Sequence, residues 1–156
     1  MSGNISHAGY TLLISASKTT NGVPVPFLET TDDTDPLIFE DIEMGDMVLD
    51  TNGNPIYWSK ASPINMSYSI TPSTVGYEVL MRIVAANTTT ADHKSVNDEI
   101  AVYRLLPNGS AARVKKGRFI SAPPAESQSQ GGRLKTGTFK MRFASIDRAP
   151  SLDAFL

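Results

Sequence analysis

A dense group of carboxylates between positions 32 and 43 is the first feature of this sequence that could perform chemistry. Its members are Asp32, Asp33, Asp35, Glu40, Asp41 and Glu43. Carboxylate oxygens suit calcium, but a calcium loop places them at short, regular spacing around a tight glycine turn. Pro36 and the apolar residues 37–39 interrupt that spacing. The pattern therefore favours a solvated acidic loop, or one that meets a basic partner, over a calcium site.

The other side chains that catalysis commonly uses are scarce. The chain has no cysteine and two histidines, His7 and His93, which excludes thiol catalysis and cysteine-based zinc sites. The histidines do not have the spacing of a zinc motif, and no G-x-S-x-G sequence marks a nucleophilic serine. A Ser–His–acid triad assembles in space, so spacing alone leaves it open. We expect a protein that is not an enzyme and that holds no cofactor and no metal.

Basic residues gather in the second half of the chain, at 113–118 and at Arg133, Lys135, Lys140 and Arg142. They fall in segments expected to be strands, so one sheet face could be positive and bind nucleic acid. The whole chain, however, has a net charge of −2. Residues 1–60 hold two cations and nine carboxylates, whereas residues 61–156 hold twelve cations and seven carboxylates. This division reflects either uneven surface charge or self-association, in which an acidic surface of one copy meets a basic surface of the next.

The length of 156 residues predicts one domain, 1–156. No apolar run approaches the roughly 20 residues that a membrane-spanning helix needs. The first ten residues lack the basic start and apolar middle of a signal peptide. We therefore expect a soluble protein that stays where it is made, unless a larger assembly carries it out.

Strands and turns dominate the predicted elements. Asn-Gly pairs supply the positive φ angles of tight hairpin turns, and they predict two hairpins, centred on 52–53 and 108–109. Further strands are expected at 9–16, 64–71 and 133–145. A long loop or arm is expected at about 17–45, and a short tail, ordered only by a partner, at 146–156.

One helix is predicted at about 73–87. Pro72 ends the preceding strand because it cannot donate to a ladder, and Ser73 or Thr74 suits the N-cap. One apolar stripe of helical spacing follows, formed by Val75, Val79, Leu80, Ile83 and Val84. The predicted fold class is mainly β: a β-sandwich or open barrel of about seven strands with this helix packed on it.

The order of elements from about 46 to 145 resembles the tail tube proteins of contractile-tailed bacteriophages, whose fold is shared with tailocins and type VI secretion tubes. The quoted order is a hairpin, "YWSKASPINMSYSITPS", a helix ending in "AAN", a second hairpin, and the final strand "RLKTGTFKMRFAS". The resemblance implies a structural virion protein that self-assembles into stacked, hexameric rings. These rings would form the inner tail tube, through which phage DNA is ejected without sequence-specific binding.

The resemblance also implies partners and a location. The partners would be further copies of the chain and the tail sheath, baseplate and tail terminator proteins. The protein would lie in the virion, and in the host cytoplasm during assembly. The N-terminal third does not align with the pattern, which leaves open a tube-end or baseplate protein of the same fold.

Contacts between subunits are expected from three regions: the 17–45 arm, the exposed side of the helix and the basic run. The candidate residues are Phe27, Leu28, Asp32, Asp33, Asp35, Leu37, Ile38, Phe39, Tyr77, Arg82, Lys115, Lys116 and Arg118. A non-catalytic β-sandwich binding module is the alternative of a different class. In that case Tyr57 and Trp58 could form an aromatic platform, although a single tryptophan in a hairpin more often packs into the core.

Overall fold

The computed structural model describes residues 11–27, 37–72, 74–106, 109–128, 131–132 and 134–149. Within these ranges lie β1 (Thr11–Ala16), β2 (Val25–Pro26), β3 (Leu37–Phe39), β4 (Gly45–Leu49), β5 (Pro55–Ser59), β6 (Ile64–Ile70), α1 (Val75–Asn87), β7 (Ile100–Leu105), β8 (Ala111–Ser121) and β9 (Gly137–Ala149). The mainly β class with a single helix is confirmed. Nine strands are described where about seven were predicted, because β2 and β3 are short strands inside the segment expected to be a loop.

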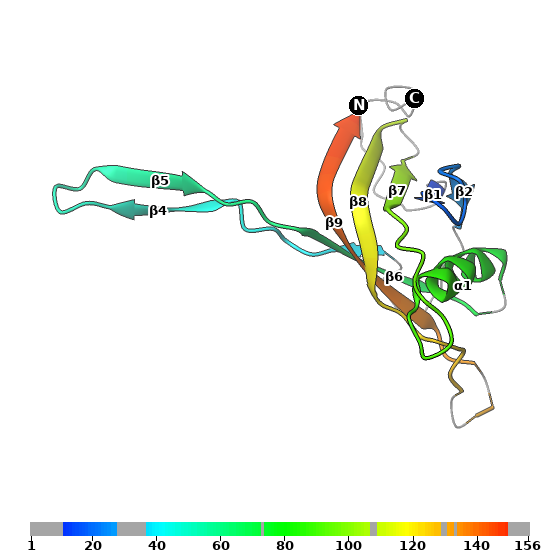
Figure 1. The fold of residues 1–156 in the computed structure, drawn as a ribbon. Helices are drawn as coiled ribbons and strands as arrows, with labels where there is room; N and C mark the ends of the chain where they lie inside the picture. Colours follow the sequence, from blue (N-terminus) through cyan, green and yellow to red (C-terminus); the bar gives the residue numbers. More distant parts are fainter. Residues whose placement is uncertain are drawn as a thin grey trace.

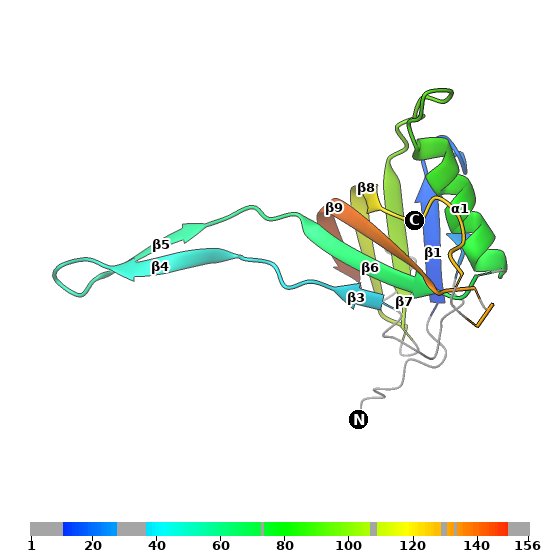
Figure 2. The same cartoon turned by 90° about the horizontal axis from the view of Figure 1, so that it is seen from below.

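Seven of the strands form one antiparallel sheet in the order β2-β1-β7-β8-β9-β6-β3, and β4 and β5 form a separate two-stranded sheet. We call the seven-stranded sheet together with α1 the body. Figures 1 and 2 show α1 lying against one face of the large sheet, close to β1. Apolar and polar side chains alternate along the strands of the body, so the apolar ones lie on the sheet face that packs against the helix. The core residues of the strands include Leu12, Ile14, Met66, Tyr68, Phe139, Met141 and Phe143.

The helix begins after Pro72, as the sequence predicts. Thr74 is the N-cap, and its hydroxyl oxygen accepts a hydrogen bond from the backbone N–H of Tyr77 at 3.3 Å. Four members of the predicted stripe are buried: Val79, Leu80, Ile83 and Val84. The prediction that Val75 seals the core is wrong, because Gly76 and Tyr77 occupy the sheet-facing side of the first turn and leave Val75 73% exposed.

Two parts of the 17–45 segment, residues 17–27 and 37–39, pack on their own chain. β2 pairs with β1, and β3 pairs with β6. Phe27 is 1% exposed and its ring meets the Tyr68 ring edge-on at 4.9 Å. A Cβ added at Gly76 would come within 2.5 Å of the Phe27 carbonyl oxygen, so glycine allows the helix to approach this segment closely. Residues 17–27 and 37–39 are therefore part of the body.

A buried carboxylate joins three parts of the body. Asp98 is 1% exposed and accepts hydrogen bonds from the backbone N–H groups of Lys18 (2.6 Å) and Thr19 (3.0 Å) and from the Thr19 hydroxyl. The side-chain amide of Asn87, at the end of α1, also donates to it at 2.8 Å. Burial by itself raises the pKa of Asp98, but these hydrogen bonds more than offset it and hold the pKa below its ordinary value. The network fixes the turn after β1 and the start of β7 to the helix.

The final strand lies four residues further along the chain than predicted: it was expected at 133–145 and covers Gly137–Ala149. β9 continues to Ala149 and pairs with β8 there, with Ala149 opposite Ala111 and Asp147 opposite Arg113. Residues 146–149 of the expected tail are therefore strand, and the rest of the tail lies outside the described residues.

Candidate assembly surface

The most prominent surface feature is a hairpin that leaves the body. We call residues 40–63 the projecting hairpin; it consists of β4, β5 and the two segments that connect them to β3 and β6. Figures 1 and 2 both show it extending far from the seven-stranded sheet. Every residue of β5 and all of β4 except Gly45 are exposed. Within the part of the chain that the structure describes, this segment has no covering layer.

The tip of the hairpin has the predicted turn. Gly53 adopts a positive φ of 80°, and the Asp50 carboxylate accepts hydrogen bonds from the backbone N–H groups of Asn52 at 2.9 Å and Asn54 at 2.8 Å. The bond from Asn54 contributes most to lowering the pKa of Asp50 below its ordinary value. The predicted hairpin is confirmed, and its tip is locally well defined.

Both faces of the projecting hairpin carry exposed apolar side chains. In the β4–β5 register Asp46 lies opposite Trp58 and Val48 opposite Ile56, and these four residues share one face. The other face carries Met47, Leu49 and Tyr57, since Met47 lies opposite Tyr57. The exposed fractions are 46–49% for Val48, Ile56 and Trp58, and 47–71% for Met47, Leu49 and Tyr57. Exposed apolar clusters of this kind mark interaction surfaces.

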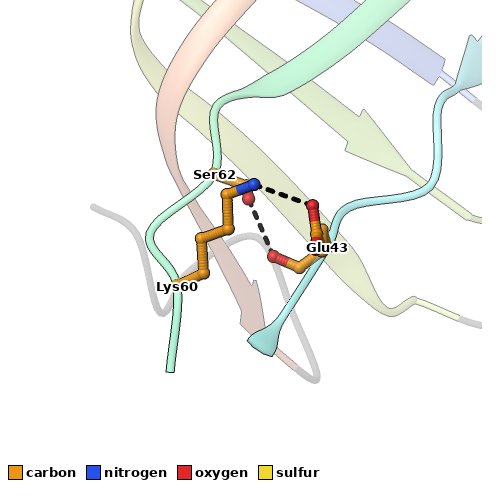
Figure 3. Close-up of polar contacts among 3 residues, drawn as sticks. All are labelled: Glu43, Lys60 and Ser62. Atoms are coloured by element: carbon orange, nitrogen blue, oxygen red, sulfur yellow. Dashed lines mark hydrogen bonds and ion pairs between the residues drawn. The ribbon is translucent and has the colours of Figure 1, made fainter. Parts of the chain in front are cut away.

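A polar clasp joins the two connecting segments at the base of the hairpin (Figure 3). Lys60 Nζ lies 2.8 Å from Glu43 Oε2, and the Ser62 hydroxyl donates to the Glu43 carbonyl oxygen at 2.7 Å. The Lys60 backbone N–H donates to the carbonyl oxygen of Met44 at 3.0 Å. An exposed ion pair contributes about 0–1 kcal/mol, so the clasp aligns the two segments and adds little to the stability of the body.

Basic side chains gather on β8 and β9. Arg113 Nη2 and Lys115 Nζ lie 2.8 Å and 3.0 Å from the same oxygen of Asp147. Hydrogen bonds from these two cations lower the pKa of Asp147, and the bond from Arg113 has the larger effect. The hydrogen bond to Asp147 in turn raises the pKa of Arg113. Five further cations of β8 and β9 are exposed: Lys116, Arg118, Lys140, Arg142 and Arg148. The projecting hairpin has the opposite charge, since residues 40–60 hold five carboxylates and one lysine.

The two outer strands of the large sheet are very short. β2 covers β1 only at Leu13 and Ile14, and β3 covers β6 only from Met66 to Tyr68. Further backbone N–H groups extend this cover: that of Phe27 donates to the Leu12 carbonyl oxygen, that of Gly22 to the Ala16 carbonyl oxygen, and that of Glu40 to the Asn65 carbonyl oxygen. Such edges can pair with a strand of another chain.

The structure places the predicted contact residues in three groups. Phe27 and Tyr77 are each 1% exposed and belong to the core, so they offer almost no side-chain surface to a neighbour. Leu37 and Phe39 pack partly against that core, while Ile38 is 45% exposed. Arg82, Lys116 and Arg118 are exposed, and Lys115 is half-buried beside Asp147. Leu28, Asp32, Asp33 and Asp35 lie outside the described residues, as does His7.

Sequence reasoning missed the apolar character of the projecting hairpin as a whole. Its signal is present: 47–49 and 56–58 are runs of three large apolar residues, without the alternation of a half-buried strand. Such runs occur in strands that are covered on both faces. Trp58, which the sequence placed in the core or on an aromatic platform, is 48% exposed.

Other kinds of site are not evident in the described part of the chain. Among these residues no group of three or more histidine or acidic side chains is placed to hold a metal ion. No described helix is long and apolar enough to cross a membrane. The described residues thus form two parts: a body with a buried core, and a hairpin whose large apolar side chains are exposed.

The chain belongs to the family described as tail fiber protein gp32, whose model matches residues 3–147. A comparison with curated proteins found no match. Solved structures share the fold over almost the whole chain. A chain of the SPP1 tail tube has a TM-score of 0.59 and 12% identity, covering 97% of this chain and 83% of that one.

Two further solved structures come from contractile systems. A chain of the anti-feeding prophage baseplate has a TM-score of 0.57 and 10% identity, with 96% and 97% of the two chains covered. A chain of the sheath–tube complex of an extracellular contractile injection system, PVC, has a TM-score of 0.55 and 12% identity, with 94% and 93% covered. At these identities the likeness establishes the fold that this tail protein shares with tube and baseplate chains.

Proposed function

We propose that this chain is the building block of the inner tail tube of a contractile-tailed bacteriophage, in which copies form stacked, hexameric rings. The observation that carries the proposal is the projecting hairpin, with exposed apolar residues on both faces, on a body that has the tube fold. A monomer would leave this surface in water, whereas assembly removes it from water.

Ring closure would use the edges of the large sheet. The β1–β2 edge of one copy pairs with the β6–β3 edge of the next, so that the sheets join into one barrel around a lumen. The short β2 and β3 leave room for this pairing. DNA would pass through the lumen during ejection without sequence-specific contacts.

The same assembly defines the remaining partners. The outer surface of the tube would meet the tail sheath, and its ends the baseplate and tail terminator proteins. The protein would be made in the host cytoplasm and retained in the virion. A tube-end or baseplate role is the second candidate, because the baseplate chain matches this fold as fully as the tube chains do.

A binding module with an aromatic platform is less well supported. Tyr57 and Trp58 are neighbours on one strand, and successive strand residues point to opposite faces. The two rings therefore cannot form one continuous platform within this hairpin.

Sedimentation velocity over a range of protein concentrations, followed by negative-stain microscopy, tests the proposed function. We expect concentration-dependent growth into rings or tubes with a central hole. A single monomer peak at every concentration would contradict the proposal. Isolated rings that never stack would instead favour the tube-end role.

A further inference from the structure

We propose that Asn52, at the tip of the projecting hairpin, is a chemical modification site at which the folded chain exchanges its side-chain amide for an acid group. The product is aspartate or isoaspartate, and the Asp50 carboxylate slows the reaction. The inference concerns the single chain and does not depend on the proposed assembly.

The reaction requires an asparagine followed by an unhindered backbone nitrogen. The Gly53 N–H gives its proton to solvent hydroxide, and the nitrogen then attacks the side-chain carbonyl carbon of Asn52. The bond from this carbon to the amide nitrogen breaks, and the leaving group takes a proton from water and departs as ammonia. Water opens the cyclic imide at either carbonyl, which gives aspartate or isoaspartate. Glycine favours the attack because it has no side chain to obstruct it.

The chain contains a second described Asn-Gly pair, which provides an internal comparison. Residues 21–22 are exposed, as residues 52–53 are, and a Cβ built at either glycine would meet no atom within 4 Å. The N–H of each glycine donates a hydrogen bond of 3.0 Å, to the Ala16 carbonyl oxygen in the first pair and to the Asp50 carbonyl oxygen in the second. The two pairs therefore differ in what must open before the nitrogen is released. The asparagine of the third pair, Asn108, lies outside the described residues.

The turn at 17–22 is fixed to the body. It ends on the carbonyl oxygen of Ala16, a residue of β1 that is 0% exposed. The buried carboxylate of Asp98 also accepts hydrogen bonds from the backbone N–H groups of Lys18 and Thr19. Segments anchored in this way open with free energies nearer to that of global unfolding. We therefore expect the first Asn-Gly pair to be strongly protected in the folded chain.

The turn at 50–54 is held only by hydrogen bonds within the hairpin, among the residues that the structure describes. The Asp50 carboxylate accepts from the N–H groups of Asn52 at 2.9 Å and Asn54 at 2.8 Å. The Asp50 N–H donates to the carbonyl oxygen of Asn54 at 2.9 Å. A two-stranded hairpin is marginally stable in water, and Figures 1 and 2 show this one far from the body. The tip can therefore open and release the Gly53 nitrogen while the body stays folded.

Asp50 acts on this reaction as a positioning residue. Its side-chain hydrogen bonds keep the turn closed, and so they keep the Gly53 nitrogen bonded to the Asp50 carbonyl oxygen. Its negative charge also disfavours removal of a proton from a nearby nitrogen. Both effects slow the reaction at Asn52, and neither reaches Asn21, which lies in the body.

A comparison of the two asparagines in the full-length protein tests the modification site. The chain is incubated below its assembly concentration at mildly alkaline pH, with and without urea, and amide loss is followed by peptide mass mapping. Cleavage with endoproteinase Asp-N places the two asparagines on different peptides, because Asp32 lies between them.

In urea we expect similar rates at Asn21 and Asn52, because glycine follows both. In the folded chain we expect the reaction at Asn52 to be severalfold faster than at Asn21. Asn52→Gln should suppress the reaction at the tip, because glutamine must form a larger ring. If folding slows both asparagines equally, or slows Asn52 more, the inference is overturned.

Variants of the two hairpin carboxylates test the role of Asp50. We expect Asp50→Ala to accelerate amide loss at Asn52 severalfold and to leave the rate at Asn21 unchanged. Asp46→Ala, which removes another exposed carboxylate of the hairpin, is the matched control and should change neither rate. Asp50→Asn keeps an acceptor oxygen without the charge, so its rate should lie between those of the wild type and Asp50→Ala. A rate in Asp50→Ala equal to that of the control would overturn the assigned role.

Discussion

The body and the projecting hairpin are built from similar residues but place them in opposite ways. In the body, apolar and polar residues alternate along the strands, and large side chains such as Phe139 and Phe143 are at most 1% exposed. In the hairpin, apolar residues follow one another, and none of the six large ones on β4 and β5 is less than 46% exposed. The body completes its own core, whereas the hairpin has the composition of a core without the layers that would cover it.

Because of this difference, we expect the body to determine the stability of the monomer and the hairpin to determine assembly. A two-stranded hairpin alone is marginally stable in water, whereas three or more strands with a covered face can fold independently. We therefore expect the body to fold as a single chain, whereas in the proposed assembly other chains cover the hairpin. Substitutions in the two regions should consequently affect different measurements.

Removing the hairpin should have the largest effect on assembly. Met44 and Lys60 are adjacent across the base, with a 3.0 Å hydrogen bond between their backbones. A short Gly-Ser linker can therefore replace residues 45–59. We expect a folded body with a thermal midpoint close to that of the wild type by circular dichroism, and a complete loss of tubes by microscopy. Tubes from the shortened protein would show that the hairpin is dispensable.

Truncating one aromatic side chain in each region should separate the two roles. Phe139 is fully buried, so Phe139→Ala should lower the free energy of unfolding by about 3–5 kcal/mol. Trp58→Ala should cost the monomer less than about 1 kcal/mol, because its ring is half exposed. Urea denaturation below the assembly concentration measures both. Equal losses would contradict the independence of the body.

Much of this division could be predicted from the sequence. Period-2 alternation at 64–70 and the stripe from Val79 to Val84 indicate a covered sheet and its helix, and both are confirmed. The Asn-Gly pair at 52–53 likewise predicts the hairpin from local sequence, and Gly53 has a positive φ. These features depend on short-range patterns, which a single sequence contains.

Which elements lie next to one another in space could not be predicted from such short-range patterns. The short β2 and β3 form because the large sheet offers them an edge, so no local pattern marks them. Tyr77 was predicted on an outer face of the helix, but it is buried, next to Gly76, whose backbone closely approaches Phe27. Apolar runs alone do not distinguish a strand covered by its own chain from one covered by a neighbour.

A smaller effect is expected at the buried carboxylate of the body. Asp98→Ala should cost about 1–3 kcal/mol of unfolding free energy, because it leaves buried donors of Thr19 and Asn87 without an acceptor. The exposed Asp92, substituted by alanine, is the matched control. Chemical denaturation at neutral pH measures both, and a cost as small as that of the control would show that the network is not stabilising.

The same group predicts a pH dependence. The folded-state pKa of Asp98 lies below its ordinary value of 3.8, so its stabilisation is present above about pH 4 and is lost as the pH falls through the folded pKa. Asp98→Asn should flatten the acid limb of the stability profile. A variant profile parallel to that of the wild type would contradict this assignment.

The smallest effect is expected at the ion pairs that Asp147 forms between β8 and β9. Asp147→Asn removes the partner of Arg113 and Lys115, and an ion pair of this exposure contributes at most about 1 kcal/mol. The loss should shrink as salt is added, because salt screens exposed charges. Thermal melts at low and high salt measure it, and a large, salt-independent loss would show a structural role beyond charge pairing.

The central claim is that copies of this chain form a tube in which each projecting hairpin is covered by neighbouring chains. Electron cryomicroscopy of the assembled full-length protein tests it most directly. We expect a hollow tube of stacked rings, with density for β4 and β5 packed against neighbouring copies. A protein that remains monomeric at high concentration, or a tube whose hairpins extend freely into solvent, would contradict the account.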